Sequence, residues 1–367
     1  MIQPGFFDLQ DRLYKIDKNG DPLTKINETV NWELFRPALE KARDKGRQSA
    51  VGPKGYDVIL LFKILILQSL YNLSDDATEF QILDRHSFGR FLGLHISQKV
   101  PDATTIWRFR EDLVNAGIVE ELFSTFDAHL RDNGFMAMKG QIVDASIVNV
   151  PKQRNSREEN ARIKEGDIPK DWSENKRRRK DVDARWTKKG GTSFYGYKNH
   201  IAVDVKHKLI RSYAVTDAAL HDSNVFEQLL VDNTSKDVWA DSAYRSEARL
   251  ERLAQEGFRE HIQRKGSRNH PLTQREQEGN RTRSRIRSRI EHIFGVQAQR
   301  AGNLLLRTIG IARARTKIGL RNLAYNIDRM GVLLATSRWS APRKRQHGER
   351  TPSSAARGGT RLQNRSD

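Results

Sequence analysis

Residues 141–150 read Gln141-Ile142-Val143-Asp144-Ala145-Ser146-Ile147-Val148-Asn149-Val150, and this stretch decides the fold class. Its apolar residues fall on both faces of an extended segment, which is typical of a central strand covered on each side. Asp144 stands in the middle of it. A lone ionised carboxylate costs several kcal/mol there, so it must be protonated, paired or bound to a cation. Taken alone, Asp144 is equally well explained by a backbone or arginine partner.

The flanking segments predict how the chain is organised. Residues 56–134 have helical periodicity, with Ser74 and Asp102 as expected N-caps. After Gly134 the pattern becomes that of strands and helices in turn: a hairpin over residues 200–216, a strand over 237–241 and a helix over 246–257. We therefore predict an α/β catalytic domain (residues 135–335) preceded by an all-helical N-terminal domain (residues 1–134).

Composition restricts the partners. The 65 Lys and Arg outnumber the 46 Asp and Glu, giving a net charge of +19, so nucleic acid or an anionic membrane surface is expected. The most apolar stretch, residues 58–67, contains Lys63 and is shorter than the ~20 residues that span a bilayer, so we predict a buried helix and no membrane partner. Residues 1–5 lack signal-peptide features, and a cytoplasmic protein is expected. The absence of cysteine excludes disulfides, thiolate zinc sites and a cysteine nucleophile.

Three segments carry further expectations about DNA. The helix that begins after Asp102 is expected to present Thr104, Thr105, Arg108 and Arg110 on its polar faces, as in a helix-turn-helix, although a helical bundle with solvated charges explains it as well. Residues 151–196 form a basic insertion that we predict to be a long loop, which either grips phosphates or is simply solvated. Residues 336–367 are predicted to be a disordered basic tail.

Two more carboxylates accompany Asp144. Asp241 ends the strand predicted over residues 237–241, and ligands gather at the carboxyl ends of strands; alternatively it stabilises the following turn. Glu291 borders the apolar stripe of a helix formed by Ile286, Ile290 and Ile293, where an exposed ion pair with Arg287 is the alternative. Residues 264–321 hold 15 Lys or Arg and only 3 Glu, which favours a cation-binding or catalytic role for Glu291.

Four stretches carry a family resemblance. They are residues 141–146, Tyr195-Gly196-Tyr197-Lys198-Asn199-His200-Ile201-Ala202-Val203-Asp204, Ala240-Asp241-Ser242-Ala243-Tyr244 and Arg287-Ser288-Arg289-Ile290-Glu291-His292-Ile293-Phe294-Gly295. In this order they resemble bacterial insertion-sequence DDE transposases of the IS-five family. The helical residues 56–113 also resemble that family's N-terminal domain, so the likeness spans about residues 56–335.

The resemblance implies a ribonuclease-H-like catalytic core in which Asp144, Asp241 and Glu291 are the catalytic, metal-binding triad. Oxygen ligands without thiolates favour Mg²⁺, with Mn²⁺ as a substitute. The family pattern Y-x2-R-x3-E-x6-K is kept only at Arg287 and Glu291, because Ser284 and Ala298 stand at the other two places. Lys198, Arg287 and Arg300 are the implied DNA contacts, and Arg300 is expected to replace the missing lysine. Asp204, His221 and Asp222 are expected to be structural or supporting residues.

The implied function is a DNA transposase that binds the terminal inverted repeats of an insertion sequence, cleaves at the element ends and joins the 3′-hydroxyl to target DNA. Its expected setting is the bacterial nucleoid, and its expected state is a homodimer or higher oligomer, because two ends must be joined. Two alternatives remain open: a non-catalytic DNA-binding protein derived from such an enzyme, acting as a repressor or architectural factor, and a purely hydrolytic metal-dependent nuclease.

Overall fold

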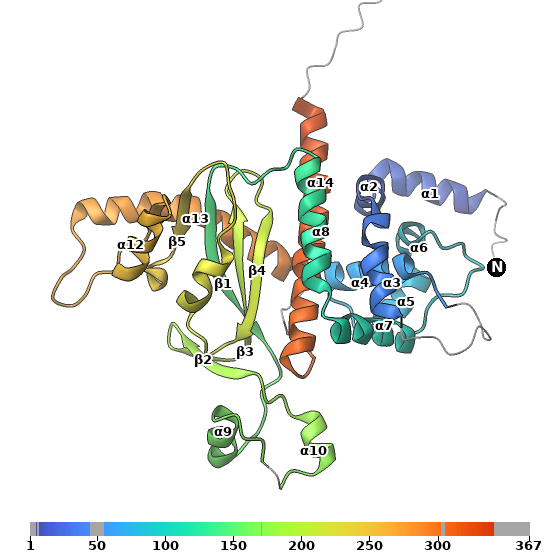
Figure 1. Cartoon of the computed structure of the whole chain (residues 1–367). Coiled ribbons are helices and arrows are strands. Elements are labelled where there is room, and N and C mark those ends of the chain that lie inside the picture. The colour runs from blue at the N-terminus through green and yellow to red at the C-terminus, as the bar shows by residue number, and fades with distance from the viewer. Residues whose placement is uncertain (1–4, 6, 45–54, 170, 302–304, 341–367) are drawn as a thin grey trace, which may run out of the picture.

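The computed structural model describes residues 5, 7–44, 55–169, 171–301 and 305–340 (Figure 1). Within the described residues, every element before residue 141 is a helix. These helices are α1 (Asp8–Asn19), α2 (Pro22–Thr29), η1 (Trp32–Phe35), α3 (Arg36–Arg43), α4 (Val58–Tyr71), α5 (Asp75–Asp84), α6 (His86–Leu92), α7 (Ala103–Ala116) and α8 (Val119–Asp132). The N-caps expected at Ser74 and Asp102 are confirmed, since each side chain accepts a backbone N–H of the helix that follows.

Helix α4 is the apolar helix predicted from residues 58–67. The Asp57 carboxylate caps it by accepting the N–H groups of Ile59 and Leu60, and most of its side chains are buried. In the part of the chain that the structure describes, no single helix is long and apolar enough to cross a membrane; α4 and α5 meet that test only as a pair, which is bent by 101°.

One mixed sheet follows the helices. Its strands are β1 (Gln141–Asn149), β2 (Arg185–Lys189), β3 (Thr192–Asp204), β4 (Ile210–Asp217), β5 (Asp237–Ala240) and β6 (Arg259–Ile262). The order is β2-β3-β1-β5-β6, and β4 also pairs with β3. Strand β3 is antiparallel to β1, β2 and β4, whereas β5 is parallel to β1 and β6. The predicted hairpin is β3 and β4, and the predicted strand over residues 237–241 is β5.

Helices cover both faces of the sheet, as the apolar pattern of residues 141–150 predicts. Alternate residues of β1 face opposite ways: Ile142 packs in one core cluster with Ile290 of α13 (Gln274–Ala301), and Val143 packs in another with Phe226. The second face is covered by η2 (Asp222–Val225), α11 (Phe226–Leu229), η3 (Ser242–Tyr244) and α12 (Glu247–Gln255). Asp144 therefore lies between two layers of helices, in the central strand.

Helix α14 (Ile311–Ser340) joins the sheet to the N-terminal helices. It contacts α4, α8 and β4, and Figure 1 shows it running between the sheet and the helical region. Two buried asparagines fix it to the sheet: Asn322 exchanges side-chain hydrogen bonds with Asn199, and Asn326 bonds both backbone groups of Ile210. A single hydrophobic cluster runs from the N-terminal helices through the sheet to α13 and α14. The division of the chain at residues 134 and 135 stays a prediction.

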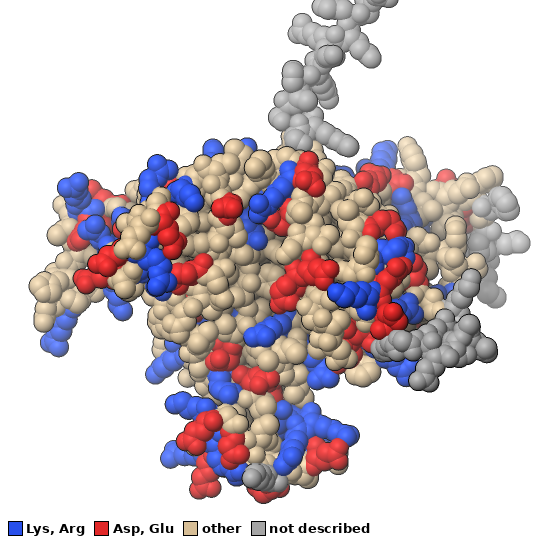
Figure 2. All heavy atoms as spheres, viewed as in Figure 1, with Lys and Arg blue, Asp and Glu red and all other residues tan. Residues whose placement is uncertain are grey.

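The expectation for residues 151–196 is wrong, and the expectation for the tail is wrong at residues 336–340 and otherwise stays a prediction. Residues 151–196 are no long loop: they contain α9 (Arg157–Lys164), α10 (Glu174–Arg179), β2 and the start of β3. Buried Trp172 holds the two helices together, because its Nε1 donates to Glu159 Oε1 at 2.7 Å and Lys176 Nζ lies 2.6 Å from the same oxygen. Figure 2 shows Lys and Arg intermingled with Asp and Glu on this protrusion. Residues 336–340 of the predicted tail belong to α14, and residues 341–367 lie outside the described residues.

Candidate active site

Two of the three predicted carboxylates come from adjacent parallel strands. Ile142 of β1 pairs with Trp239 of β5, and Asp144 and Asp241 each lie two residues further along. Asp241 continues in an extended conformation beyond β5, with φ −78° and ψ 174°. Because side chains alternate along a strand and neighbouring strands are ~4.8 Å apart, both carboxylates lie at the same level on the face covered by α13.

Helix α13 brings Arg287 and Glu291 over that face. Its apolar stripe is anchored by Ile290 and Ile293, both fully buried, and the helix packs on β1 and β5. Arg287 and Glu291 are one turn apart on the adjoining face. The amphipathic helix predicted from this pattern is confirmed, and it extends beyond the apolar stripe at both ends, over Gln274–Ala301.

The guanidinium of Arg287 lies between the carboxylates. Its Nε is 3.4 Å from Asp144 Oδ2, its Nη2 is 3.6 Å from Glu291 Oε1, and its Nη1 donates to Gln263 Oε1 at 2.9 Å. The Nε is buried and has no hydrogen-bond partner among the described residues. Glu291 is 64% exposed and in an i,i+4 ion pair, as in the alternative explanation given for it. Arg287 thus neutralises Asp144 while it separates Asp144 from Glu291.

Asp144 has the electrostatics of a buried carboxylate. It is 8% exposed, and its burial raises its pKa above the usual value for an aspartate, an effect that the Asp241 charge increases. Arg287 and a 2.8 Å hydrogen bond from the Ala145 N–H act in the opposite direction. The expectation that Asp144 must be protonated, paired or cation-bound is met by pairing.

Asp241 plays a local part as well. Its Oδ1 accepts the Ala243 N–H at 2.8 Å and so caps η3, as the alternative of a turn-stabilising aspartate predicts.

Tyr244 belongs to the same turn and lies beneath the carboxylate site. Its hydroxyl is fully buried without a hydrogen-bond partner among the described residues, and burial followed by the charges of Asp144, Asp222 and Asp241 raises its pKa. Tyr244 therefore contributes an unused polar group close to the carboxylates.

Lys198 lies on the opposite face of the sheet. It pairs with Ile147 in the β1 register, on the face of Val143, and its Nζ contacts Asp222 Oδ1 and Leu220 O, both at 2.7 Å. On the same face, burial lowers the pKa of His200 to about 4, so this imidazole is neutral at pH 7. Lys198 is 8% exposed, and it serves here as the partner of Asp222. The prediction that Lys198 contacts DNA is not met in this arrangement, because burial removes it from the surface.

The donor set suits a divalent cation, but the side chains are not arranged around one. Asp144, Asp241 and Glu291 offer the oxygen ligands that Mg²⁺ prefers. Within the described ranges, however, no three His, Cys, Asp or Glu side chains come close enough together to hold a metal ion. Arg287 occupies the space between two of the three. The residues fit a metal only if the Arg287 guanidinium moves aside, which breaks its hydrogen bond to Gln263 Oε1 and its contacts with Asp144 and Glu291.

The predicted DNA-reading helix is α7. Thr104 and Arg108 are exposed and Thr105 is half-buried, as a surface helix requires. The expectation for Arg110 is wrong: it is 6% exposed, and its two terminal nitrogens bind both Asp75 carboxylate oxygens at 2.6 and 2.8 Å. The side chain of Arg300 lies outside the described residues. A helix-turn-helix role for α7 stays a prediction.

The supporting residues expected from the sequence differ in their roles. Asp204 is structural: fully buried, it accepts the backbone N–H groups of His207 and Leu209 and pairs with Arg211 in the turn between β3 and β4. His221 caps η2. Asp222, by contrast, is a neighbour of the site through Lys198 and Tyr244. Asp222 was expected as a supporting residue, whereas the position of Tyr244 beside it was not predicted, because only the folded chain brings the two segments together.

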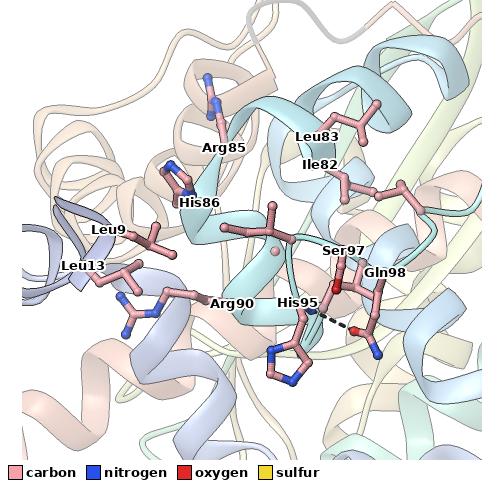
Figure 3. A pocket seen from close by; sticks show the side chains of 14 residues that line it. Leu9, Leu13, Ile82, Leu83, Arg85, His86, Arg90, His95, Ser97 and Gln98 are labelled. Atoms are coloured by element: carbon pink, nitrogen blue, oxygen red, sulfur yellow. Dashed lines mark hydrogen bonds between the residues drawn. The ribbon is translucent and has the colours of Figure 1, made fainter. Parts of the chain in front are cut away.

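A separate cavity of about 530 Å³ lies among the N-terminal helices (Figure 3). Leu9 and Leu13 of α1 face Ile82, Leu83 and neighbours from α5, α6 and the segment after α6. Its lining, within the described residues, contains no Asp or Glu, and the His95 N–H donates to Gln98 Oε1 in one wall. It offers none of the carboxylate chemistry found on the sheet.

Comparison with known proteins places the chain in a family. The family model described as Transposase DDE domain matches residues 136–327, which is more than half of the 367 residues. The chain belongs to the Transposase DDE domain family. The model described as Transposase domain (DUF772) matches residues 11–112, within the helical region. Family membership confirms the predicted DDE transposase, whereas the IS-five group in particular stays a prediction.

Membership in the Transposase DDE domain family also implies a ribonuclease-H-like core, and the mixed α/β sheet agrees with the predicted fold class. Among solved structures, the chain is similar to one described as a piggyBac transposase synaptic complex with hairpin DNA. The identity is 11%, the TM-score is 0.43, and the match covers 86% of this chain and 73% of that one. A likeness this distant adds nothing to the assignment.

Proposed function

We propose that this chain is a DNA transposase that binds the terminal inverted repeats of an insertion sequence, cleaves at the element ends and joins the freed 3′-hydroxyl to target DNA. One observation carries the proposal: in a chain of the Transposase DDE domain family, Asp144 and Asp241 lie side by side on parallel strands beneath the helix that carries Glu291.

Asp144, Asp241 and Glu291 would hold Mg²⁺, or Mn²⁺ in its place, and the bound ions would activate the attacking oxygen and neutralise charge on the leaving oxygen. Arg287 keeps the buried Asp144 charge compensated until DNA binds. It then turns its guanidinium toward a phosphate, for which planar paired donors are suited.

In this proposal, DNA is bound by the positive net charge of the protein and by helix α7, which reads the DNA sequence. The net charge of +19 attracts the polyanion, and the exposed Thr104 and Arg108 on α7 are placed to contact it. Because two element ends must be joined in one reaction, we propose a homodimer or larger assembly on DNA. The protein would act in the cytoplasm, on the nucleoid.

The deciding experiment incubates purified protein with Mg²⁺, a labelled duplex carrying the element end and a supercoiled target. Joined product supports the transposase. Cut product without joining supports the hydrolytic nuclease instead. A bound complex without cutting supports the repressor or architectural protein, an alternative favoured by one feature, the position of Arg287 between Asp144 and Glu291.

A further inference from the structure

A second cavity, of about 480 Å³, lies where the helical region meets α14. Its walls are the end of α4, the start of α5, one face of α7, residues 305–308 and one face of α14. Its volume is within the range of about 300–1,000 Å³ typical of small-ligand sites. None of the residues of the carboxylate site lines it.

The lining charges are strongly unbalanced toward cations. Its two carboxylates are already paired: Asp75 with Arg110 at 2.6 and 2.8 Å, and Glu111 with Arg313 at 2.7 to 2.9 Å. Three further cations line the same space, namely Arg307, Lys317 and Arg321. We call this space, defined by these three residues, the cationic cavity.

The three cations have almost no partners among the described residues. Arg321 is 9% exposed, and its one hydrogen bond, from Nη2 to Asn72 Oδ1, is long at 3.4 Å. Lys317 is half-buried, and Arg307 is exposed; within the described part of the chain neither side chain forms a hydrogen bond or ion pair, although the Asp75 and Glu111 charges act on Lys317. Burial, followed by the charge of Arg110, lowers the pKa of Lys317 to about 8, and burial lowers that of Arg321 to about 10.

Uncompensated buried cations are unfavourable unless an anion joins them. Arg313, Lys317 and Arg321 recur every fourth residue on α14, so their heads lie along one stripe. The ten-residue helix α5 begins at the same cavity, but Ser74 caps it and its first turn already carries Asp75 and Asp76, so its N-terminus has its negative charge. The cations that form no ion pair, with Arg321 among them nine-tenths buried, are therefore the feature that favours an anionic ligand.

We propose that the cationic cavity is a phosphate-binding site separate from the carboxylate site. The shared chemistry is a phosphate oxygen held by Lys317, Arg321 and Arg307. Its source is either a DNA backbone phosphate or a free nucleotide or pyrophosphate; the DNA source rests on the proposed function. Trp107, which is 46% exposed, lies at the same cavity and offers a ring on which a base can stack.

The test uses the full chain and two variants, Lys317→Gln and Arg321→Gln. Arg315→Gln is the matched control, because it removes the same charge from an exposed position of α14 that does not line the cavity. Binding of a 20-base-pair duplex of arbitrary sequence is measured from about 50 to 200 mM salt. Binding of pyrophosphate and of ATP is measured by calorimetry.

If a DNA phosphate is the ligand, each cavity variant binds the duplex about tenfold more weakly, and the slope of log K against log salt shrinks by about one. If the source is free phosphate, duplex binding is unchanged, and only the cavity variants lose pyrophosphate or ATP. Loss of binding that is equal in Arg315→Gln and the cavity variants, or no loss in either assay, overturns the proposal.

Thermal unfolding of each variant shows whether a loss of binding results from a loss of the folded structure. Should Arg321→Gln unfold, Lys317→Gln decides, because no described residue bonds to Lys317. Neither assay requires cleavage, so a failure of the proposed catalytic function leaves the pyrophosphate result interpretable.

Discussion

Around Asp144 the chain supplies its own counterion, since the Arg287 guanidinium lies 3.4 Å away, whereas the half-buried Lys317 and the buried Arg321 form no ion pair among the described residues. The two regions also differ in the sign of their charge: carboxylates gather on the sheet, and cations gather on α14. A region that includes its counterion is stable without a ligand and must rearrange to bind one. A region without a counterion is preorganised for an anion and less stable until the anion is bound.

The largest expected effect tests the carboxylate side of this comparison. Asp144→Asn, Asp241→Asn and Glu291→Gln should each lower the rate of end cleavage by about 10³-fold or more, because each removes a charge that the proposed metal site needs. Gel-shift binding to the element end should persist. Asp232→Asn, at an exposed carboxylate outside the site, is the control. Strand transfer retained in any of the three variants removes that residue from the triad.

The next effect concerns a cation that does have its partner. Arg110→Ala should destabilise the protein by about 3–5 kcal/mol, because it leaves the Asp75 carboxylate without its bidentate partner. Urea unfolding measures the difference. Asp75→Asn with Arg110→Ala, tested together, should recover part of the loss. A single variant as stable as the parent would show that the pair contributes nothing.

Lys317 should behave in the opposite way. Lys317→Met should raise the free energy of unfolding at pH 7 by at most about 3 kcal/mol, because the half-buried ammonium forms no ion pair among the described residues. The pKa of Lys317 is lowered from 10.5 to about 8, so the parent protein should gain stability as the pH rises from about 8 to 10.5, and the variant should not. Unfolding curves across this range decide it. Destabilisation by Lys317→Met would mean that the ammonium has an essential structural contact.

A smaller effect is expected from Asp144 on stability. Burial raises its pKa in the folded protein above 3.8, so the folded state binds more protons than the unfolded state in this window. Stability due to this group should fall as the pH rises from about 3.8 through the raised value. In Asp144→Asn this fall should be absent, as urea unfolding at pH 4 to 8 will show. An identical pH profile in the two proteins would mean that Arg287 compensates the charge completely.

The smallest effect is expected from the ion pair between Arg313 and Glu111, which forms the rim of the cationic cavity. Arg313 and Glu111 form a pair in which the arginine side chain is 45% exposed, so Arg313→Ala should cost only about 0.5 kcal/mol. Thermal unfolding measures it. A loss as large as that expected for Arg110→Ala would show that the rim, and not only the buried pair, fixes this wall of the cavity.

Much of the carboxylate site was predictable from local patterns. The apolar run around Asp144 predicts a covered strand, and the same residues form β1 at the centre of the sheet. The short apolar segment before Asp241 predicts β5, and the stripe of Ile286, Ile290 and Ile293 predicts the helix that carries Glu291. These signals work because each depends only on which side of a regular element is buried.

Other features were not predictable in the same way. Arg110 has the spacing of a surface residue on α7, but its direction is fixed by Asp75 on another helix. Residues 151–196 have a loop-like composition, yet Trp172, Glu159 and Lys176 fold them into a small helical unit. Helix α14 was missed because its buried Asn322 and Asn326, bonded to Asn199 and Ile210, read as polar interruptions in the sequence.

The sequence by itself determined the alternation of helices and strands, the basic character of the chain and the three carboxylates, because periodicity and charge are properties of neighbouring residues. Only the tertiary structure decided that Arg287 stands between Asp144 and Glu291, that Lys198 pairs with Asp222, and that Lys317 and Arg321 share a cavity with the start of α5. Charge compensation depends on distance in space, and the packing of α13 and α14 sets those distances.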